Sequence, residues 1–354
     1  MGFRLLCADE PPDTAAWLAL WNRWPARQVS AHPNFGALFA GPGDRVVCAA
    51  LEWLDGGILF PLILRLVNHE EWAVSGPAFW DATSPYGYGG PFCWGCGAAE
   101  VQEFWSGLQR WAADEGVVSL FARLSLFPEE LAAFEGTVLD NRPNVVRSLD
   151  LPSEALWMDY EHKVRKNVKH AQRVGVRVEV DLDGSRLDEF LSIYHATMDR
   201  RGAEASYYFG RTFLDRLVAG LPGQFAFFHA LHGETVVSTE LVLVSRDHIY
   251  SFLGGTRADA FDLRPNDLLK HEIILWGQRA GKKAFVLGGG YGGPDGIFRY
   301  KVSFSPHGEV PFRTGQIIFD QQAYDRLIDA RRAWERLQGR VWQPRPGFFP
   351  AYRA

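Results

Sequence analysis

Lysine is nearly absent from the first half of this 354-residue sequence. The chain has seven lysines against 30 arginines, and none precedes Lys163. Residues 1–150 carry nine arginines and 18 acidic residues, a balance of −9, whereas residues 151–354 carry 28 basic and 24 acidic residues, a balance of +4. An anionic partner should therefore bind the second half of the chain.

Cysteine is also scarce, since four cysteines in a chain of this length are typical of a reducing compartment. Cys93 and Cys96 form a C-x-x-C pair, but the other two cysteines supply no second pair at zinc spacing. The surrounding Pro/Gly-rich sequence predicts a loop, whereas a redox pair should begin a helix. A zinc or redox role is the less favoured interpretation, and we expect no metal site.

Long apolar runs are missing as well. No run reaches the length of about 18 residues that a membrane span requires. The first ten residues become acidic too soon for a signal peptide. We therefore expect a cytoplasmic protein, with contact at the inner face of the membrane left open.

Apolar residues make up 47% of the chain, including 13 tryptophans and 25 phenylalanines, so a large core can form. At this length two domains are expected. Periodicity and turn residues predict a first set of elements and then a second in similar order. The first set is a helix over 13–24, strands over 45–53, 58–67 and 72–80, a helix over 100–115 and a strand over 117–124. The second set is helices over 185–201 and 206–221, strands over 224–231, 235–244 and 248–253, a loop over 254–265, a helix over 266–280 and a strand over 284–287. A strand over 311–319 and a helix over 320–338 follow.

An offset of 165 residues places Trp111 on Trp276 and Gly116 on Gly281. Each glycine follows a predicted helix, at the position of a left-handed cap. The repeated order and this offset predict a duplicated domain. We expect domains at 1–152 and 153–319, with residues 320–354 available to complete the first.

Four motifs accompany this order of elements. They are Ser-Pro-Tyr-Gly-Tyr-Gly-Gly-Pro at 84–91, Tyr-x-x-Thr-Met-x-Arg at 194–200 with Tyr207-Tyr208 after it, Arg-Pro-Asn-Asp-Leu-Leu at 264–269, and the glycine-rich stretch 287–304. With these motifs the whole chain resembles the Fem family, which transfers an amino acid from aminoacyl-tRNA to an amine of a peptidoglycan precursor. The resemblance implies an α/β (α+β) protein of two tandem GNAT-like domains. Each domain would be a mixed, mostly antiparallel sheet flanked by helices.

The resemblance implies that Lys301 faces the reaction centre. N-acyl transfer needs an amine that loses a proton, a stabilised carbonyl oxygen and bound phosphates, and a lysine can serve the second or third need. The alternative is a solvated lysine on an edge strand. Glu240 is the candidate general base, because a carboxylate within a run of strand-forming residues must meet a cation or have a raised pKa. A structural ion pair is the alternative for Glu240.

The resemblance also implies substrate-binding residues. Arg200 matches an arginine of the family that binds phosphate or carboxylate, and a surface arginine is the alternative. Four aromatic residues could line the acceptor site or simply pack, namely Tyr86, Tyr207, Tyr208 and Tyr300. At the first-domain position where Fem enzymes tend to have a phosphate-binding lysine, residues 30–39 contain none.

Two helices are candidates for binding the donor, one that begins at Asn266 and one within residues 160–177. The helix that begins at Asn266, after Arg264, presents free N–H groups that would hold a coenzyme A pyrophosphate. The glycine spacing usual for that site is not legible in residues 254–260, which favours aminoacyl-tRNA over acyl-CoA.

Residues 160–177 form a basic amphipathic helix that ends at Gly175, with Val164, Val168 and Ala171 facing inward. Its outer cations include Lys163, Arg165 and Lys166. A solvated surface is the ordinary interpretation of such a charge run. The other is a site for tRNA phosphates or for a lipid-linked pyrophosphate at the membrane.

We therefore expect an N-acyltransferase that acts on a lipid-linked or nucleotide-linked cell-envelope precursor of peptidoglycan or polysaccharide. It would have no permanently bound cofactor, and the oligomeric state stays open. One alternative is a coenzyme A-dependent N-acyltransferase of an amino sugar. The other is a non-catalytic binding protein of envelope assembly.

Overall fold

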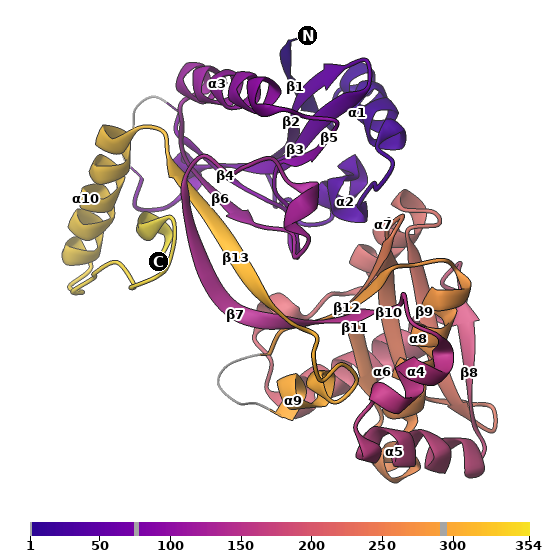
Figure 1. Ribbon diagram of the computed structural model, residues 1–354. Coiled ribbons are helices and arrows are strands. Elements are labelled where there is room, and N and C mark those ends of the chain that lie inside the picture. Colours follow the sequence, from indigo (N-terminus) through magenta and orange to yellow (C-terminus); the bar gives the residue numbers. More distant parts are fainter. Residues whose placement is uncertain (1, 74–77, 291–295) are drawn as a thin grey trace. The chain divides into compact units, whose positions relative to one another are not determined.

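A computed structural model describes residues 2–73, 78–290 and 296–354 (Figure 1). By its contacts the chain divides into two compact units. The first unit comprises residues 1–25, 30–141 and 312–354, and the second comprises residues 26–29 and 142–311.

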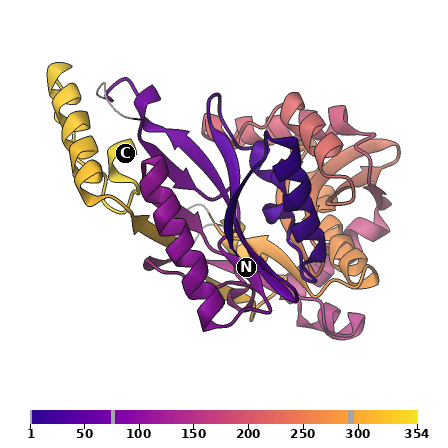
Figure 2. The same cartoon turned by 90° about the horizontal axis from the view of Figure 1, so that it is seen from above.

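In the first unit the strands lie in the order β1-β2-β3-β4-β6-β13, and β5 also pairs with β3. All these strands pair antiparallel except β4 and β6, which are parallel. The strands are β1 (Phe3–Cys7), β2 (Arg45–Trp53), β3 (Gly56–Leu66), β4 (Trp80–Thr83), β5 (Phe92–Trp94), β6 (Val117–Arg123) and β13 (Glu309–Ile318). The helices are α1 (Pro11–Arg23), α2 (Pro33–Ala37), α3 (Ala98–Glu115) and α10 (Gln321–Leu337). Helix α3 covers one face of this sheet with buried aromatic and aliphatic residues (Figures 1 and 2).

The second unit contains a sheet in the order β8-β9-β10-β11-β12-β7. Only β11 and β12 are parallel among these described strands. The strands are β7 (Thr137–Ser148), β8 (Val176–Asp181), β9 (Phe225–His232), β10 (Thr235–Val244), β11 (His248–Thr256) and β12 (Ala284–Gly288). The helices are α4 (Ser153–Asp159), α5 (His162–Arg173), α6 (Leu187–Arg201), α7 (Arg211–Gly220), α8 (Pro265–Arg279) and α9 (Gly296–Val302).

The two sheets repeat the same order of strands, which confirms the predicted duplication and the predicted α/β class. In each sheet one parallel pair, β4 and β6 or β11 and β12, is joined through a long helix. Gly116 and Gly281 follow these two helices with φ of 70° and 68°, in the left-handed region that favours glycine. The last strand in each order does not follow its neighbour in the sequence, since β13 comes after β12 in the chain and β7 comes after β6.

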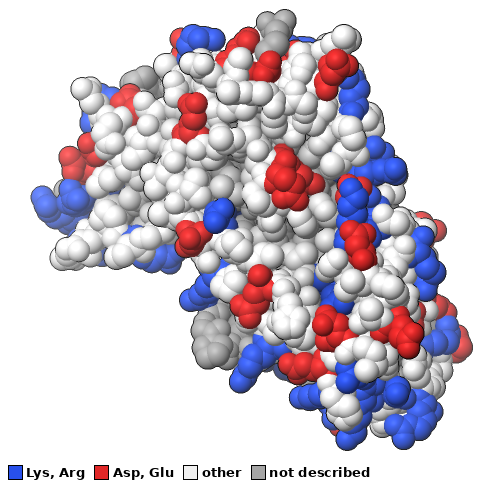
Figure 3. Space-filling view, in the orientation of Figure 1, with Lys and Arg blue, Asp and Glu red and all other residues white. Residues whose placement is uncertain are grey.

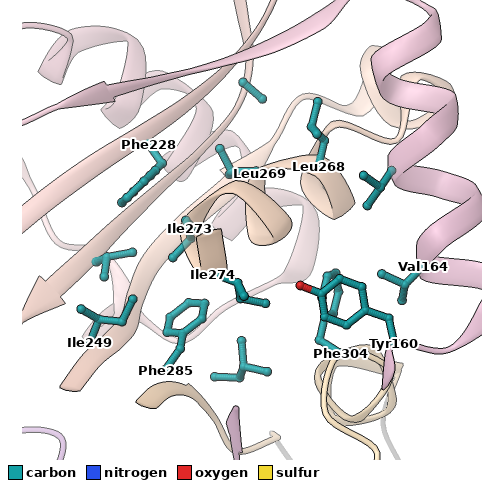
Figure 4. Close-up of a cluster of buried hydrophobic side chains, with 14 of the residues drawn as sticks. Tyr160, Val164, Phe228, Ile249, Leu268, Leu269, Ile273, Ile274, Phe285 and Phe304 are labelled. Atoms are coloured by element: carbon teal, nitrogen blue, oxygen red, sulfur yellow. The ribbon is translucent and has the colours of Figure 1, made fainter. Parts of the chain in front are cut away.

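Side chains of the second sheet alternate between two helical layers, as expected for a strand. Phe227 packs against Phe190 of α6 with ring centroids 5.1 Å apart, whereas Phe228 packs against Trp276 of α8 at 5.5 Å. Helix α8 buries Leu268, Leu269, Ile273 and Ile274 on the same side (Figure 4). Helix α5 adds Val164, Val168 and Ala171, so the inward face predicted for the basic helix is confirmed. Burial of each of these leucines and isoleucines contributes roughly 1.5–3 kcal/mol.

Several predicted element boundaries were wrong. The third strand was expected over 72–80, but the observed strand β4 begins only at Trp80. The chain first forms a 3-10 helix at Val67–His69. Residues 74–77 lie outside the described residues. The helix expected from residue 206 begins at Arg211. The loop expected over 254–265 is partly strand, since β11 continues to Thr256 and a 3-10 helix follows at Ala258–Leu263.

Candidate active site

The parallel strands β11 and β12 separate partway along β11. They pair from His248 opposite Ala284 to Tyr250 opposite Val286, and β11 then continues for six residues without pairing to described residues of β12. On its other side β11 has a bulge, because Leu253 pairs with Leu241 and Ser251 with Val242, which leaves Phe252 as the extra residue. A bulge bends its strand and is common beside active sites. In open α/β sheets ligands bind beyond the carboxyl ends of the strands, so this end of β11 is a candidate ligand site.

A buried ion pair lies next to the bulge. The Lys270 ammonium of α8 donates to both carboxylate oxygens of Glu240 on β10, at 2.5 and 2.6 Å, and to the Ser251 hydroxyl at 3.2 Å. The Lys270 and Glu240 side chains are 7% and 6% exposed. Lys270 also lies over the Phe285 ring of β12, 5.3 Å from its centroid. The ion pair that was the alternative prediction for Glu240 is therefore confirmed.

Lys270 is a residue that sequence reasoning missed. Its neighbours Ile273, Ile274 and Gly277 recur at i+3, i+4 and i+7, and all three are buried. This spacing places Lys270 on the inward face of α8. The sequence signal for this ion pair was a lysine on the inward face of a helix together with Glu240, a glutamate within a strand that needed a cation.

Tyr300 lies within electrostatic reach of Glu240. Its hydroxyl donates to the Asn266 carbonyl at 3.1 Å, and its ring lies 5.2 Å from Phe304. Burial raises the pKa of Tyr300 well above its ordinary value, and the Asp267 and Glu240 carboxylates raise it further. The hydroxyl therefore stays protonated at neutral pH.

The start of α8 carries an acidic group. Arg264 takes a left-handed conformation with φ of 56°, Pro265 occupies the first turn, and the buried Asp267 follows. The Asp267 carboxylate accepts a hydrogen bond from Asn167 of α5 at 3.1 Å, and burial raises its pKa. Since the free N–H groups of a helix start favour negative charge, Asp267 already lies where a pyrophosphate would bind.

Lys301 lies on the helix α9, so the alternative that placed it on an edge strand was wrong. Its ammonium donates to the Gly289 carbonyl at 2.6 Å, immediately beyond the end of β12. Gly288 has φ of 87°, a conformation that glycine adopts without strain. The next part of the predicted glycine-rich loop, residues 291–295, lies outside the described residues.

Arg200 lies at the end of α6. Its guanidinium donates to the Thr256 carbonyl at 3.1 Å and lies 5.0 Å above the Phe261 ring. Beyond α6, the Tyr207 carbonyl accepts from the Tyr194 hydroxyl, and the Tyr208 hydroxyl donates to Asp199 at 2.8 Å. The exposed Arg200 retains further N–H groups in its fork of five donors, so it can still bind an anion.

The other candidates are more scattered. Tyr86 belongs to the first unit, where it is 40% exposed and stacks on Phe39. Lys163 and Lys166 are exposed on α5, whereas Arg165 donates to the carbonyls of Met158 and Tyr160 at the end of α4. Figure 3 shows Lys and Arg side chains gathered over α5 at the lower edge of the view.

The structure thus groups Glu240 and Tyr300 with Lys270, Ser251 and the first turn of α8.

Cys93 and Cys96 are joined by a disulfide. Among the described residues no three His, Cys, Asp or Glu side chains are placed to hold a metal ion. In the same part of the chain no helix is both long and apolar enough to span a membrane.

Comparison with known proteins identifies the fold. Residues 159–302 match the family described as "Acetyltransferase (GNAT) domain". FemX has a similar structure, with a TM-score of 0.66 and 13% identity over 88% of this chain and 97% of its own. L-PGS from Bacillus licheniformis has a TM-score of 0.52 and 13% identity, over 86% of this chain and 91% of its own. The C-terminal domain ascribed to a lysylphosphatidylglycerol synthetase of Agrobacterium fabrum has a TM-score of 0.53 and 14% identity, over 88% of this chain and 94% of its own. A search of curated proteins found no match.

These matches define the protein as having the tandem GNAT fold, with a GNAT domain in its second unit. The similarity to FemX confirms the predicted resemblance to the Fem family at the level of fold.

Proposed function

We propose that the protein is an N-acyltransferase that transfers an aminoacyl group from aminoacyl-tRNA to an amine of a cell-envelope precursor. The observation that carries this proposal is the separation of β11 from β12 within the segment that matches a GNAT acetyltransferase domain. An acyl group can lie there against the part of β11 that does not pair with described residues of β12.

The reaction forms one bond and breaks one. The amine nitrogen of the acceptor attacks the acyl carbonyl carbon, and the new C–N amide bond replaces the ester C–O bond to the tRNA ribose. The amine loses one proton, and the leaving ribose oxygen takes one up. The carbonyl oxygen carries negative charge in between, so hydrogen-bond donors placed around it lower the barrier.

The donor is proposed to be aminoacyl-tRNA because the usual coenzyme A features are weak. The Asp267 carboxylate lies in the first turn of α8, where a coenzyme A pyrophosphate would bind. Helix α5 exposes Lys163 and Lys166, which can contact tRNA phosphates. A second candidate is a coenzyme A-dependent N-acyltransferase of an amino sugar, which is favoured by the match to a domain described as an acetyltransferase.

The acceptor is proposed from the relatives' names. FemX, L-PGS from Bacillus licheniformis and a domain ascribed to a lysylphosphatidylglycerol synthetase share the fold at TM-scores above 0.5. A lysylphosphatidylglycerol synthetase makes, by its name, an aminoacylated membrane lipid. A lipid-linked or nucleotide-linked precursor, met in the cytoplasm or at the inner face of the membrane, fits this pattern.

The site residues take the following proposed roles. Lys301, held at Gly289, binds a phosphate or polarises a carbonyl oxygen in the reaction centre. Arg200 binds a phosphate or carboxylate through its remaining N–H groups. Glu240 would have to give up its bonds to Lys270 to act as general base, so its proposed role is to hold Lys270 in place. Tyr207 and Tyr208 of the second unit are proposed to contact the acceptor.

The experiment compares donors. The purified protein is incubated with tRNA charged with labelled amino acids, or with labelled acyl-CoA, and with lipid-linked, nucleotide-linked and amino-sugar acceptors. We expect label on an envelope precursor from charged tRNA, and none from deacylated tRNA plus free amino acid. Transfer from acyl-CoA alone would establish the second candidate. No transfer from any donor, with retained binding of an acceptor, would point to a non-catalytic binding protein.

A further inference from the structure

The Ser251 hydroxyl lies at the point where β11 leaves β12. It follows Tyr250, the last residue of β11 that pairs with β12, and it precedes the bulged Phe252. Ser251 is half-buried, whereas its partners Lys270 and Glu240 are almost fully buried. Ser251 was not among the candidate site residues predicted from the sequence.

The direction of the Lys270–Ser251 hydrogen bond follows from valence. An ammonium group has three donors and no acceptor, so the Ser251 oxygen must accept the 3.2 Å contact from Lys270. The other two N–H groups of Lys270 meet the two oxygens of Glu240. The Ser251 hydroxyl therefore keeps its own proton for another acceptor, and within the described part of the chain it makes no other hydrogen bond.

The Lys270 charge also changes how strongly this hydroxyl donates. A hydroxyl that accepts a hydrogen bond from a cation becomes a better donor, because hydrogen bonds in a chain polarise one another. The nearby Tyr300 hydroxyl is directed to the Asn266 carbonyl, and the Lys301 ammonium to the Gly289 carbonyl. Ser251 thus combines a polarised O–H with a position at the separation of the two parallel strands.

We propose that the Ser251 hydroxyl donates a hydrogen bond to the acyl carbonyl oxygen of the donor as that oxygen becomes an oxyanion. This inference rests on the proposed acyl transfer. Ser251 retains its proton throughout, since the amine loses one proton and the leaving ribose oxygen takes one up. Lys270 is a positioning residue that acts through Ser251, and Glu240 holds Lys270.

The same geometry argues against an acyl-serine intermediate. A nucleophilic serine needs a neighbour that removes its proton. The ammonium of Lys270 is a donor to both Glu240 and Ser251, so it cannot accept that proton in this arrangement. The acceptor amine should therefore attack the donor directly.

The test compares Ser251→Ala with Ser251→Thr and with Ser238→Ala. Ser238 is a matched control, because this buried serine lies on neighbouring β10 and its hydroxyl bonds the Gly255 carbonyl and the Thr256 hydroxyl. We expect Ser251→Ala to lower kcat about 10²–10³-fold, the usual loss of one oxyanion donor. The KM for the donor should stay within about threefold, since the interaction forms mainly in the transition state. Ser251→Thr, which keeps the hydroxyl, should recover most of kcat, and Ser238→Ala should keep it.

Three results would overturn the inference. A Ser251→Ala enzyme that retains kcat within about threefold of the wild type removes the oxyanion role while leaving the proposed function intact. A labelled acyl group found on Ser251 by mass spectrometry replaces it with a covalent mechanism. A wild-type protein that transfers label from no donor overturns both the inference and the proposed function.

Discussion

Breaking the Glu240–Lys270 ion pair should strongly destabilise the second unit. Both side chains are at least 93% buried, and the ammonium lies 2.5 and 2.6 Å from the two carboxylate oxygens. Lys270→Met removes the cation and leaves the Glu240 carboxylate buried without its partner. Removal of one member of such a pair costs about 3–5 kcal/mol, because the remaining charge stays desolvated.

The second substitution distinguishes the pair from ordinary packing. In the double variant Lys270→Met with Glu240→Leu no buried charge remains, and apolar side chains fill similar volumes. Replacing both members of a buried pair by apolar residues is often neutral or stabilising. The double variant should therefore be more stable than Lys270→Met alone, although it has one more substitution in the core.

Calorimetry is the suitable assay, because a chain of two units need not unfold in one transition. For a unit of about 150–250 residues, each kcal/mol shifts Tm by about 2–4 °C, so Lys270→Met should lower one transition by roughly 6–20 °C. Arg211→Ala is the control, since Arg211 pairs with Asp215 on an exposed helix surface and should change Tm little. If Lys270→Met melts within 2 °C of the wild type, or if the double variant is no more stable than the single one, the pair does not have the assigned energetic role.

Three further outcomes are expected. Charge reversal by Lys163→Glu with Lys166→Glu should raise the KM for charged tRNA about tenfold and flatten its salt dependence, without changing Tm; an unchanged KM would show that α5 is only a solvated surface. Lys301→Ala should lower kcat about 100-fold in the transfer assay, and activity retained in that variant would remove the ammonium at Gly289 from the mechanism. Burial lowers the pKa of His271 to about 4 from 6.5, so the unfolded chain binds a proton between these values while the folded protein does not, and stability falls as the pH drops from 6.5 to 4. His271→Gln should reduce this loss by up to about 3 kcal/mol in urea titrations at pH 7 and pH 4.5, and an equal loss in both proteins would show that other groups cause it.

Much of the architecture could be predicted from local sequence. Helix α5 was recognisable because Val164, Val168 and Ala171 recur at helical spacing among cations, and all three are buried. The duplicated order was recognisable because Gly116 and Gly281 end equivalent helices, and both have positive φ. Periodicity and chain reversal depend on neighbouring residues, so the sequence alone determines them. Lys301 shows the limit of this reasoning, because its aromatic neighbours fit a strand as well as the short helix α9.

Tertiary structure decided the contacts of the site. The sequence alone determined that Glu240, within a strand, needed a partner or a raised pKa, but it did not determine that the partner is Lys270 on α8. The bulge at Phe252 and the separation of β11 from β12 depend on how β10, β11 and β12 align, so the sequence of no single strand predicts them. Helix α8 brings Lys270 to Ser251 only when it packs on the sheet. Local patterns therefore determined the elements and their order, whereas the site required long-range packing, because its polar groups come from separate elements whose distances no local interaction controls.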